Sequence, residues 1–133
     1  NDLVIAIEGS VSSMDPANIP DTNAISATRG CYEMLVAFDE NQEIQGQLAE
    51  SYEVSEDSLT YTFHLREGVK FTDGTDFNAA AVKANYDRII DKENNLRQRR
   101  TFVVTGEDGS ETYRVESIET PDDYTVVFKL TEP

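Results

Sequence analysis

The sequence predicts an α+β domain, in which antiparallel hairpins pack together with helices. Two stretches, LTYTFHL at residues 59–65 and YTVVFKL at residues 124–130, alternate apolar and polar residues directly after an acidic turn. This alternation is typical of a strand with one buried and one solvated face. A segment with helical spacing of apolar residues lies between them in the chain, so two similar hairpins surround a helix. The length of 133 residues suits a single domain with its own core.

A buried strand, a loop and a helix are predicted in the first third of the chain. Residues 3–7 form a continuous apolar run, which indicates a strand buried on both faces. The loop at residues 9–20 is rich in Ser, Asp, Asn and Pro, and Asp21 then offers an oxygen that can cap a helix. Gly30 weakens this helix by about 1 kcal/mol relative to alanine. The residues that recur at helical spacing are Ile25, Arg29, Tyr32, Leu35 and Val36.

A hairpin and a second turn come next. The first strand contains the alternating residues Tyr52 and Val54, residues 55–58 form the turn, and the strand 59–65 returns. The polar face of the returning strand carries Thr60, Thr62 and His64. After Gly68 the strand is expected to continue through Val69 and Phe71, up to a turn at residues 73–74.

A second helix and a second β region complete the prediction. Asn78 is the expected cap, and Phe77 and Val82 are placed to close a hydrophobic staple around it. The buried stripe of this helix consists of Val82, Tyr86, Ile89 and Ile90. The helical pattern fades at residues 91–95, and the β pattern resumes at residues 102–104 with turns at 106–109 and 121–123.

The charge balance excludes several classes of partner. The chain carries 26 acidic and 11 basic residues, for a net charge of −15. Such a surface repels nucleic-acid phosphates and anionic lipid. It suits a cationic ligand, or it keeps an exported protein in solution. No stretch approaches the roughly 18 apolar residues of a membrane span.

The residue types that catalysis needs are scarce. His64 and Cys31 are each the single member of their type, which leaves no second base, no zinc cage and no disulfide within the chain. We expect His64 to be a solvated strand residue and Cys31 to be a small buried side chain on the first helix. Phosphate-binding loops are absent from the sequence. The sequence therefore predicts neither an enzyme nor a cofactor, and a hydrolase based on His64 is the weaker alternative.

Two features are suited to binding. The loop at residues 9–23 follows a buried strand and precedes a helix, where open α/β architectures place ligands. A basic cluster, formed by Arg97, Arg99 and Arg100, holds three of the eleven basic residues. These arginines could hold a carboxylate or an anionic chelate through charge-assisted hydrogen bonds, or they could pair with neighbouring acids on the surface.

The end of the sequence suggests a continuation. KLTEP stops straight after a strand, and the buried-type strand at residues 3–7 has no parallel partner among the later, half-solvated strands. We therefore expect this chain to be a fragment of a longer protein.

One run of motifs resembles a known family. The run is CYEMLVAFD, then LAESYEVSEDSLTYTFHLREGVKFTDGTDFNAAAVKANYDRI, then DDYTVVFKLTEP. In this order the motifs resemble the family 5 extracellular solute-binding proteins, the peptide- and nickel-type receptors of ABC importers. The likeness extends from Leu3 to Pro133.

The resemblance implies a fold and a role. The fold would be the N-terminal part of a periplasmic-binding-protein-like structure. Residues 1–41 would be the first strand and helix of the main ligand-binding lobe, residues 42–133 an accessory α+β subdomain, and the second lobe would be absent from this chain. The protein would be no enzyme but a receptor that captures oligopeptides and delivers them to an ABC permease, with nickel or another metal chelate as the alternative ligand. It would work outside the cytoplasm, in the periplasm or as a cell-surface lipoprotein, with no nucleic-acid partner.

Site residues are also implied by the resemblance. Nickel-type relatives approach their ligand with the loop before the first helix and with an arginine of an R-Q-R element, which match residues 20–25 and Arg99 here. Phe102 stands where that pattern has tryptophan, and the insertion VVTGEDGSET departs from it. Peptide receptors are the more numerous branch of the family, so peptide is the favoured ligand. Together with the preceding loop, the candidate ligand-binding residues are Ser12, Ser13, Met14, Asn23, Ile25 and Arg99.

Overall fold

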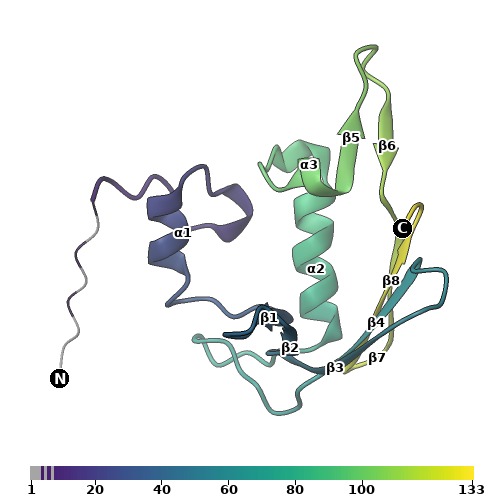
Figure 1. Cartoon of the computed structure of the whole chain (residues 1–133), viewed down its shortest axis with the longest axis horizontal. Coiled ribbons are helices and arrows are strands. Elements are labelled where there is room, and N and C mark those ends of the chain that lie inside the picture. The colour runs from purple at the N-terminus through teal and green to yellow at the C-terminus, as the bar shows by residue number, and fades with distance from the viewer. Residues whose placement is uncertain (1–3, 5, 7) are drawn as a thin grey trace.

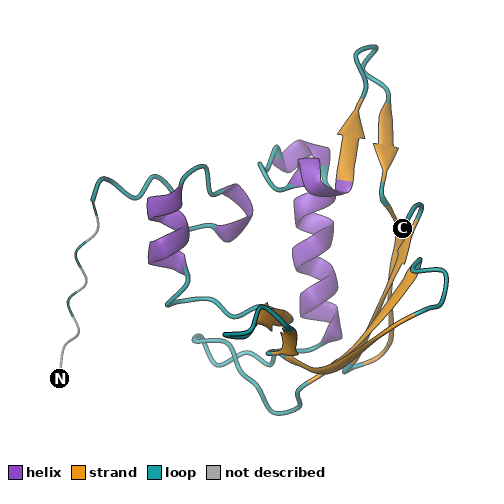
Figure 2. Cartoon of the chain, in the orientation of Figure 1, coloured by secondary structure: helices purple, strands orange, loops and turns teal. Residues whose placement is uncertain are grey.

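The computed structural model of the chain describes residues 4, 6 and 8–133, and it confirms the α+β class (Figures 1 and 2). The long helix α2 lies between a curved antiparallel sheet on one side and the segment that contains α1 on the other. A narrow hairpin, β5–β6, projects beyond the end of the sheet. The strand predicted at residues 3–7 falls on residues outside the described part, apart from Val4 and Ala6, which are exposed.

The central sheet joins the two stretches that look alike in the sequence. Its strands lie in the order β3-β4-β8-β7, all antiparallel. They are β3 (Ala49–Val54), β4 (Thr60–Leu65), β8 (Thr125–Leu130) and β7 (Val115–Asp122). Tyr61 lies opposite Phe128 and Phe63 opposite Val126, so the matching alternation of the two stretches builds one apolar face in the middle of the sheet.

The helix α2 (Ala79–Ile90) begins at the predicted cap. Asn78 Oδ1 accepts a hydrogen bond from the Ala81 N–H at 2.9 Å, which satisfies one of the unpaired donors of the first turn. Phe77 and Val82 are both buried, as the staple requires. The apolar face of α2 packs against the sheet, with the buried core formed by Ala49, Leu65, Phe77, Ala79, Val82, Ile118, Val126 and Phe128.

The first helix, α1 (Thr22–Thr28), starts as predicted but is shorter. Asp21 Oδ1 accepts from the Ala24 N–H at 2.9 Å and caps it. The predicted continuation to Val36 is wrong, because after Gly30 the backbone carbonyls accept hydrogen bonds from another segment of the chain. The Met34 and Leu35 carbonyls accept from the N–H groups of residues 47–49 at 2.9–3.0 Å, which holds this segment extended.

Two further expectations change with the shorter helix. Val36 belongs to β1 (Val36–Phe38), which pairs with β2 (Ile44–Gly46). Cys31 is exposed in the turn after α1, so the expectation of a buried cysteine on a helix is wrong. A side chain placed one turn beyond the helix end no longer faces the packed side of that helix.

The remaining elements are short. The predicted strand through Val69 and Phe71 is reduced to a single bridge between Lys70 and Asp76, because a tight turn follows at once and its Gly74 N–H donates to the Phe71 carbonyl at 2.9 Å. The short elements are η1 (Pro16–Asn18), η2 (Lys92–Asn94), α3 (Arg99–Phe102), β5 (Val103–Thr105) and β6 (Glu111–Tyr113). Of these, α3 was missed by the sequence pattern, which extended the β region to residue 102.

Candidate functional site

The candidate loop, residues 9–23, is held by hydrogen bonds within it and by one from Tyr32. The Ser12 hydroxyl donates to Asp21 Oδ2 at 2.7 Å, and Ser13 Oγ accepts from the Asp15 N–H at 3.1 Å. The Met14 carbonyl accepts from the Tyr32 hydroxyl at 3.0 Å. Hydrogen bonds from the Ala24 N–H and then from Ser12 hold the pKa of the Asp21 carboxyl below its usual value. The loop therefore has a defined shape before any ligand arrives.

Asn23 and Ile25 lie on α1, next to the beginning of this loop. A Cβ atom on Gly9 would come within 2.5 Å of Asn23 Nδ2, and the φ of Gly9 is +109°. Only glycine allows the chain to approach the helix so closely in that conformation. Ile25 is exposed. Five of the six predicted site residues thus belong to one segment, residues 12–25, and Arg99 lies outside it.

Two contacts hold this segment, one to α2 and one to the residue before α3. Arg88 forms an ion pair with Asp15 through both of its terminal nitrogens, and its Nη1 lies 3.3 Å from Asp15 Oδ1. The Gln98 N–H donates to the Ala17 carbonyl at 3.0 Å. The hydrogen bond from Arg88 holds the pKa of Asp15 below its usual value. The candidate loop is therefore positioned by the end of α2 that leads to Arg99.

Arg99 does not point at a free space. Its Nε donates to the Ile90 carbonyl at 2.7 Å, and its Nη1 and Nη2 donate to the two Glu111 oxygens at 3.2 and 3.0 Å. Of the two alternatives for the basic cluster, pairing with a neighbouring acid is what Arg99 shows. Arg97 and Arg100 are exposed and form no ion pair within the part of the chain that the structure describes.

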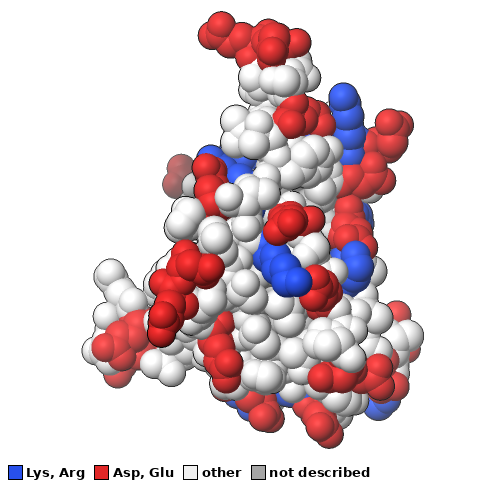
Figure 3. Space-filling view, turned by 90° about the vertical axis from the view of Figure 1, so that its right-hand side faces the viewer, with Lys and Arg blue, Asp and Glu red and all other residues white. Residues whose placement is uncertain are grey.

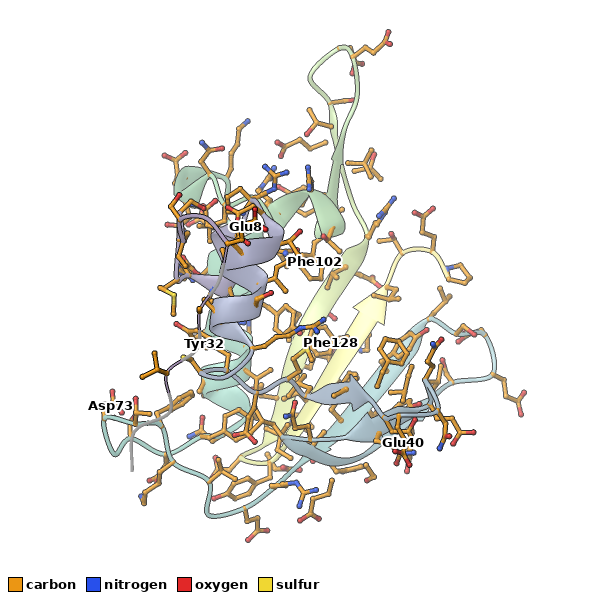
Figure 4. All side chains as sticks on the ribbon, turned by 60° about the vertical axis from the view of Figure 1, so that its left-hand side comes forward. Glu8, Tyr32, Glu40, Asp73, Phe102 and Phe128 are labelled. Atoms are coloured by element: carbon orange, nitrogen blue, oxygen red, sulfur yellow. The ribbon has the colours of Figure 1, made fainter. Side chains whose placement is uncertain are left out.

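An open cavity separates the candidate loop from the sheet. Its volume is about 790 Å³, and Asp15 and Arg88 are among the residues that line it. The residues that form its apolar wall include Met14, Tyr32, Phe63, Phe77, Val82 and Tyr86. Figure 4 shows Tyr32 just below α1, on the side where the chain turns towards the sheet. Such a mostly apolar cavity with a few charged groups at its rim has the character of a ligand pocket.

A second cavity lies at the other end of the sheet. It measures about 480 Å³ and is lined by aromatic residues from four elements, among them Tyr61, Tyr86, Phe102 and Phe128. The Tyr86 ring meets Phe102 and Phe128 edge-on, at centroid distances of 5.7 Å and 4.9 Å. Burial raises the pKa of the Tyr86 hydroxyl. Figure 4 shows Phe102 and Phe128 one above the other along this space.

Within residues 4, 6 and 8–133, catalytic and metal-binding groups are not brought together. His64 lies on the polar face of β4, with Nε2 3.9 Å from Glu53 Oε1, and Cys31 lies in the turn after α1. Neither residue lines either cavity. Among the described residues, no group of three or more His, Cys, Asp or Glu side chains could hold a metal ion. No helix in the same part of the chain has both the length and the apolar character needed to cross a bilayer.

The surface is acidic. Figure 3 shows Asp and Glu side chains spread over one face of the molecule, with few Lys and Arg side chains between them. The −15 net charge is therefore distributed and does not form a single patch on this face.

Sequence reasoning missed the residues that hold the site in place. Asp15, Arg88 and Glu111 were not singled out, although Asp15 precedes a proline at the start of a turn, a position where an Asp caps the following residues. No local pattern links Asp15 to Arg88, because 73 residues separate them.

Comparisons with known proteins give a consistent result. The family model for bacterial extracellular solute-binding proteins, family 5 (middle region), matches residues 43–133. The glutathione-binding protein GsiB of Escherichia coli K12 is 45% identical over 101 residues, which are 76% of this chain and 20% of GsiB. The chain thus spans about a fifth of the length of the curated relatives that it matches.

Two solved structures share the fold and a measurable sequence identity. AgaA from A. tumefaciens R10, in complex with agropinic acid, matches with a TM-score of 0.80 and 35% identity, over 94% of this chain and 23% of AgaA. NikZ from Campylobacter jejuni, in complex with Ni(L-His), matches with a TM-score of 0.78 and 26% identity, over 96% of this chain and 23% of NikZ.

Proposed function

This chain belongs to family 5 of the bacterial extracellular solute-binding proteins, and from that premise we propose that it captures a short peptide outside the cytoplasm and delivers it to an ABC permease. The observation that carries this proposal is the 45% identity to a glutathione-binding protein over three-quarters of the chain, since glutathione is itself a short peptide. The protein would work in the periplasm or as a cell-surface lipoprotein, as a transport component and not as an enzyme.

The chain would act as one part of a larger receptor. Residues 1–41 would begin the main ligand-binding lobe, residues 42–133 would form an accessory subdomain, and a second lobe would come from sequence outside this chain. The short length relative to GsiB supports this division. The two parts would be joined by the β1–β2 pairing, by the Asp15–Arg88 ion pair and by the hydrogen bond between Gln98 and Ala17.

The ligand-facing residues proposed here are those of the α1 segment. Ser12 and Ser13 carry hydroxyl groups on an exposed loop, and Met14 lies on the wall of the cavity of about 790 Å³. Asn23 and Ile25 continue the same surface along α1. Hydroxyls, an amide and apolar side chains suit a peptide backbone and its side chains better than they suit a bare metal ion.

A metal chelate is the second candidate ligand. The observation in its favour is the fold shared with NikZ, whose structure holds Ni(L-His). An anionic chelate is less favoured, because the Arg99 guanidinium already donates hydrogen bonds to Glu111.

The test is native mass spectrometry of the full-length gene product, purified without refolding so that bound cargo is kept. We expect an added mass of a few hundred daltons that fragments as a short peptide, and calorimetry with glutathione and with short peptides then ranks the ligands. An added mass with the isotope pattern of nickel would favour the chelate instead. Peptide hydrolysis by the purified protein would contradict the transport role. The 133-residue chain by itself is expected to bind peptides weakly, because the proposed second lobe would not be there to close over them.

A further inference from the structure

Arg99 and Glu111 form a closed pair at the base of the β5–β6 hairpin. Glu111 accepts two hydrogen bonds from the Arg99 guanidinium, at 3.2 and 3.0 Å, and a third from the Tyr113 hydroxyl at 3.2 Å. Arg99 also donates to the Ile90 carbonyl and, at 3.4 Å, to the Tyr113 hydroxyl. These contacts occupy four of the five N–H donors of the guanidinium.

The surroundings of the Glu111 carboxylate are those of an anion site. Lys92 Nζ lies 3.7 Å from Glu111 Oε1, so two cations and one hydroxyl converge on a single carboxylate. The guanidinium carbon of Arg99 also lies 5.9 Å from the centre of the Tyr113 ring, which fixes its plane further. The side chains of Arg99 and Glu111 are only 13% and 18% exposed. A fork-shaped donor that faces a carboxylate in this way is the arrangement proteins use to bind carboxylate and phosphate ligands.

We propose that Lys92, Arg99 and Tyr113 form an anion site that Glu111 occupies from within the chain, so that a free carboxylate or phosphate binds there only once the charge of Glu111 is removed.

Glu111 competes better than a free anion for this site because it belongs to the same chain. Glu111 is the first residue of β6, and β6 is paired with β5, so its carboxylate is held beside Arg99 at the high effective concentration of an intramolecular group. A ligand carboxylate would have to displace Glu111 and would then meet its negative charge at short range. The hydrogen bond from Arg99 holds the pKa of Glu111 below its usual value, so the occupant stays ionised at neutral pH.

The experiment uses the full-length gene product and inorganic phosphate as the probe. Glu111→Gln removes the charge with little change of shape, and Glu107→Gln is the matched control, because it removes the same charge from the turn of the same hairpin. Phosphate affinity is measured as the rise in melting temperature with phosphate concentration, at constant ionic strength. We expect the association constant for phosphate to be about tenfold or more higher in Glu111→Gln than in Glu107→Gln, the effect of a freed hydrogen bond to a charged group.

A double variant tests whether phosphate binds at Arg99, and chemical labelling of the unsubstituted protein provides a second test. In Arg99→Gln/Glu111→Gln the gain in phosphate affinity must disappear; a gain that persists would overturn the proposal. Equal phosphate affinities in the two single variants would overturn it too. If Glu111→Gln fails to fold, phenylglyoxal labelling of the unsubstituted protein decides. We expect Arg97 and Arg100 to be modified before Arg99, with no effect of phosphate on Arg99, and protection of Arg99 by phosphate would contradict the inference. None of these results depends on the natural ligand, so they can fail or succeed independently of the peptide-binding function.

Discussion

Phe128→Ala is expected to cost the chain a large part of its stability. Phe128 is 7% exposed at the centre of the sheet, and its ring meets Phe63 and Tyr86 edge-on at centroid distances of 5.7 Å and 4.9 Å. Removing a buried phenylalanine side chain costs roughly 3–5 kcal/mol, and each aromatic pair contributes about 0.5–1.5 kcal/mol beyond the area it buries. Phe128 also lines the open cavity of about 480 Å³, where water can reach the space that the ring leaves. We therefore expect a loss of about 3 kcal/mol, at the lower end of that range.

The assay is equilibrium unfolding of the chain in urea, with Phe38→Ala as the matched control. Phe38 is 72% exposed on β1, so the same substitution there should change the free energy of unfolding by no more than about 0.5 kcal/mol. The midpoint should fall for Phe128→Ala while the slope with denaturant stays the same. Phe128→Leu should fall between the two, because it keeps most of the apolar volume and loses both aromatic contacts. Equal midpoints for Phe128→Ala and Phe38→Ala would refute the position assigned to this core.

Three further predictions concern the cap, the ion pair and the loop. Asn78→Ala should lower the free energy of unfolding by about 1 kcal/mol, measured in the same assay, and Asn78→Asp should restore most of it, because either side chain can accept the Ala81 N–H. The lowered pKa of Asp15 adds stability above the pKa that this group has in the unfolded chain, and that stability is lost as the pH falls through the folded pKa. The free energy of unfolding should therefore fall below about pH 4, and it should fall less steeply with pH in Arg88→Gln. Gly9→Ala should free the loop from α1, since φ is +109° and the new Cβ would overlap Asn23, and limited proteolysis should then cut near residues 9–14 faster than in Gly30→Ala, where nothing lies within 4 Å of the new Cβ.

The elements that the sequence predicts correctly are those determined by residues close together in the chain. The two hairpins of the sheet and α2 were found, because period-two alternation and the Asn78 cap are signals that lie within a few residues of one another. The end of α1 was not found. Residues 31–36 keep helical spacing, but the Met34 and Leu35 carbonyls accept hydrogen bonds from residues 47–49, and this non-local pairing overrides a helix already weakened at Gly30.

The same limit applies to the site. The arginine cluster was recognised as either a ligand site or a set of surface ion pairs, and the sequence left both open because 26 acids offer many partners. The choice of Glu111 comes from the β5–β6 hairpin, which folds Glu111 back onto Arg99 across 12 positions of sequence. The sequence signal for this contact is the insertion with its Gly-Glu-Asp-Gly turn, since a hairpin there must return the chain to the residues before it.

The contacts of the candidate loop indicate which part of the molecule controls it. The loop is joined to α2 by the Asp15–Arg88 ion pair and to the segment after α2 by the hydrogen bond between Ala17 and Gln98. Arg88 lies in the C-terminal half of α2 and Gln98 directly precedes Arg99, whose Nε donates a hydrogen bond to the carbonyl of Ile90 at the end of α2. A shift of the C-terminal half of α2 would therefore move the loop and the Arg99–Glu111 pair together. Ligand affinity should respond to substitutions at Arg88 even though Arg88 lies at the rim of the cavity, because its partner Asp15 directly follows Met14 on the cavity wall.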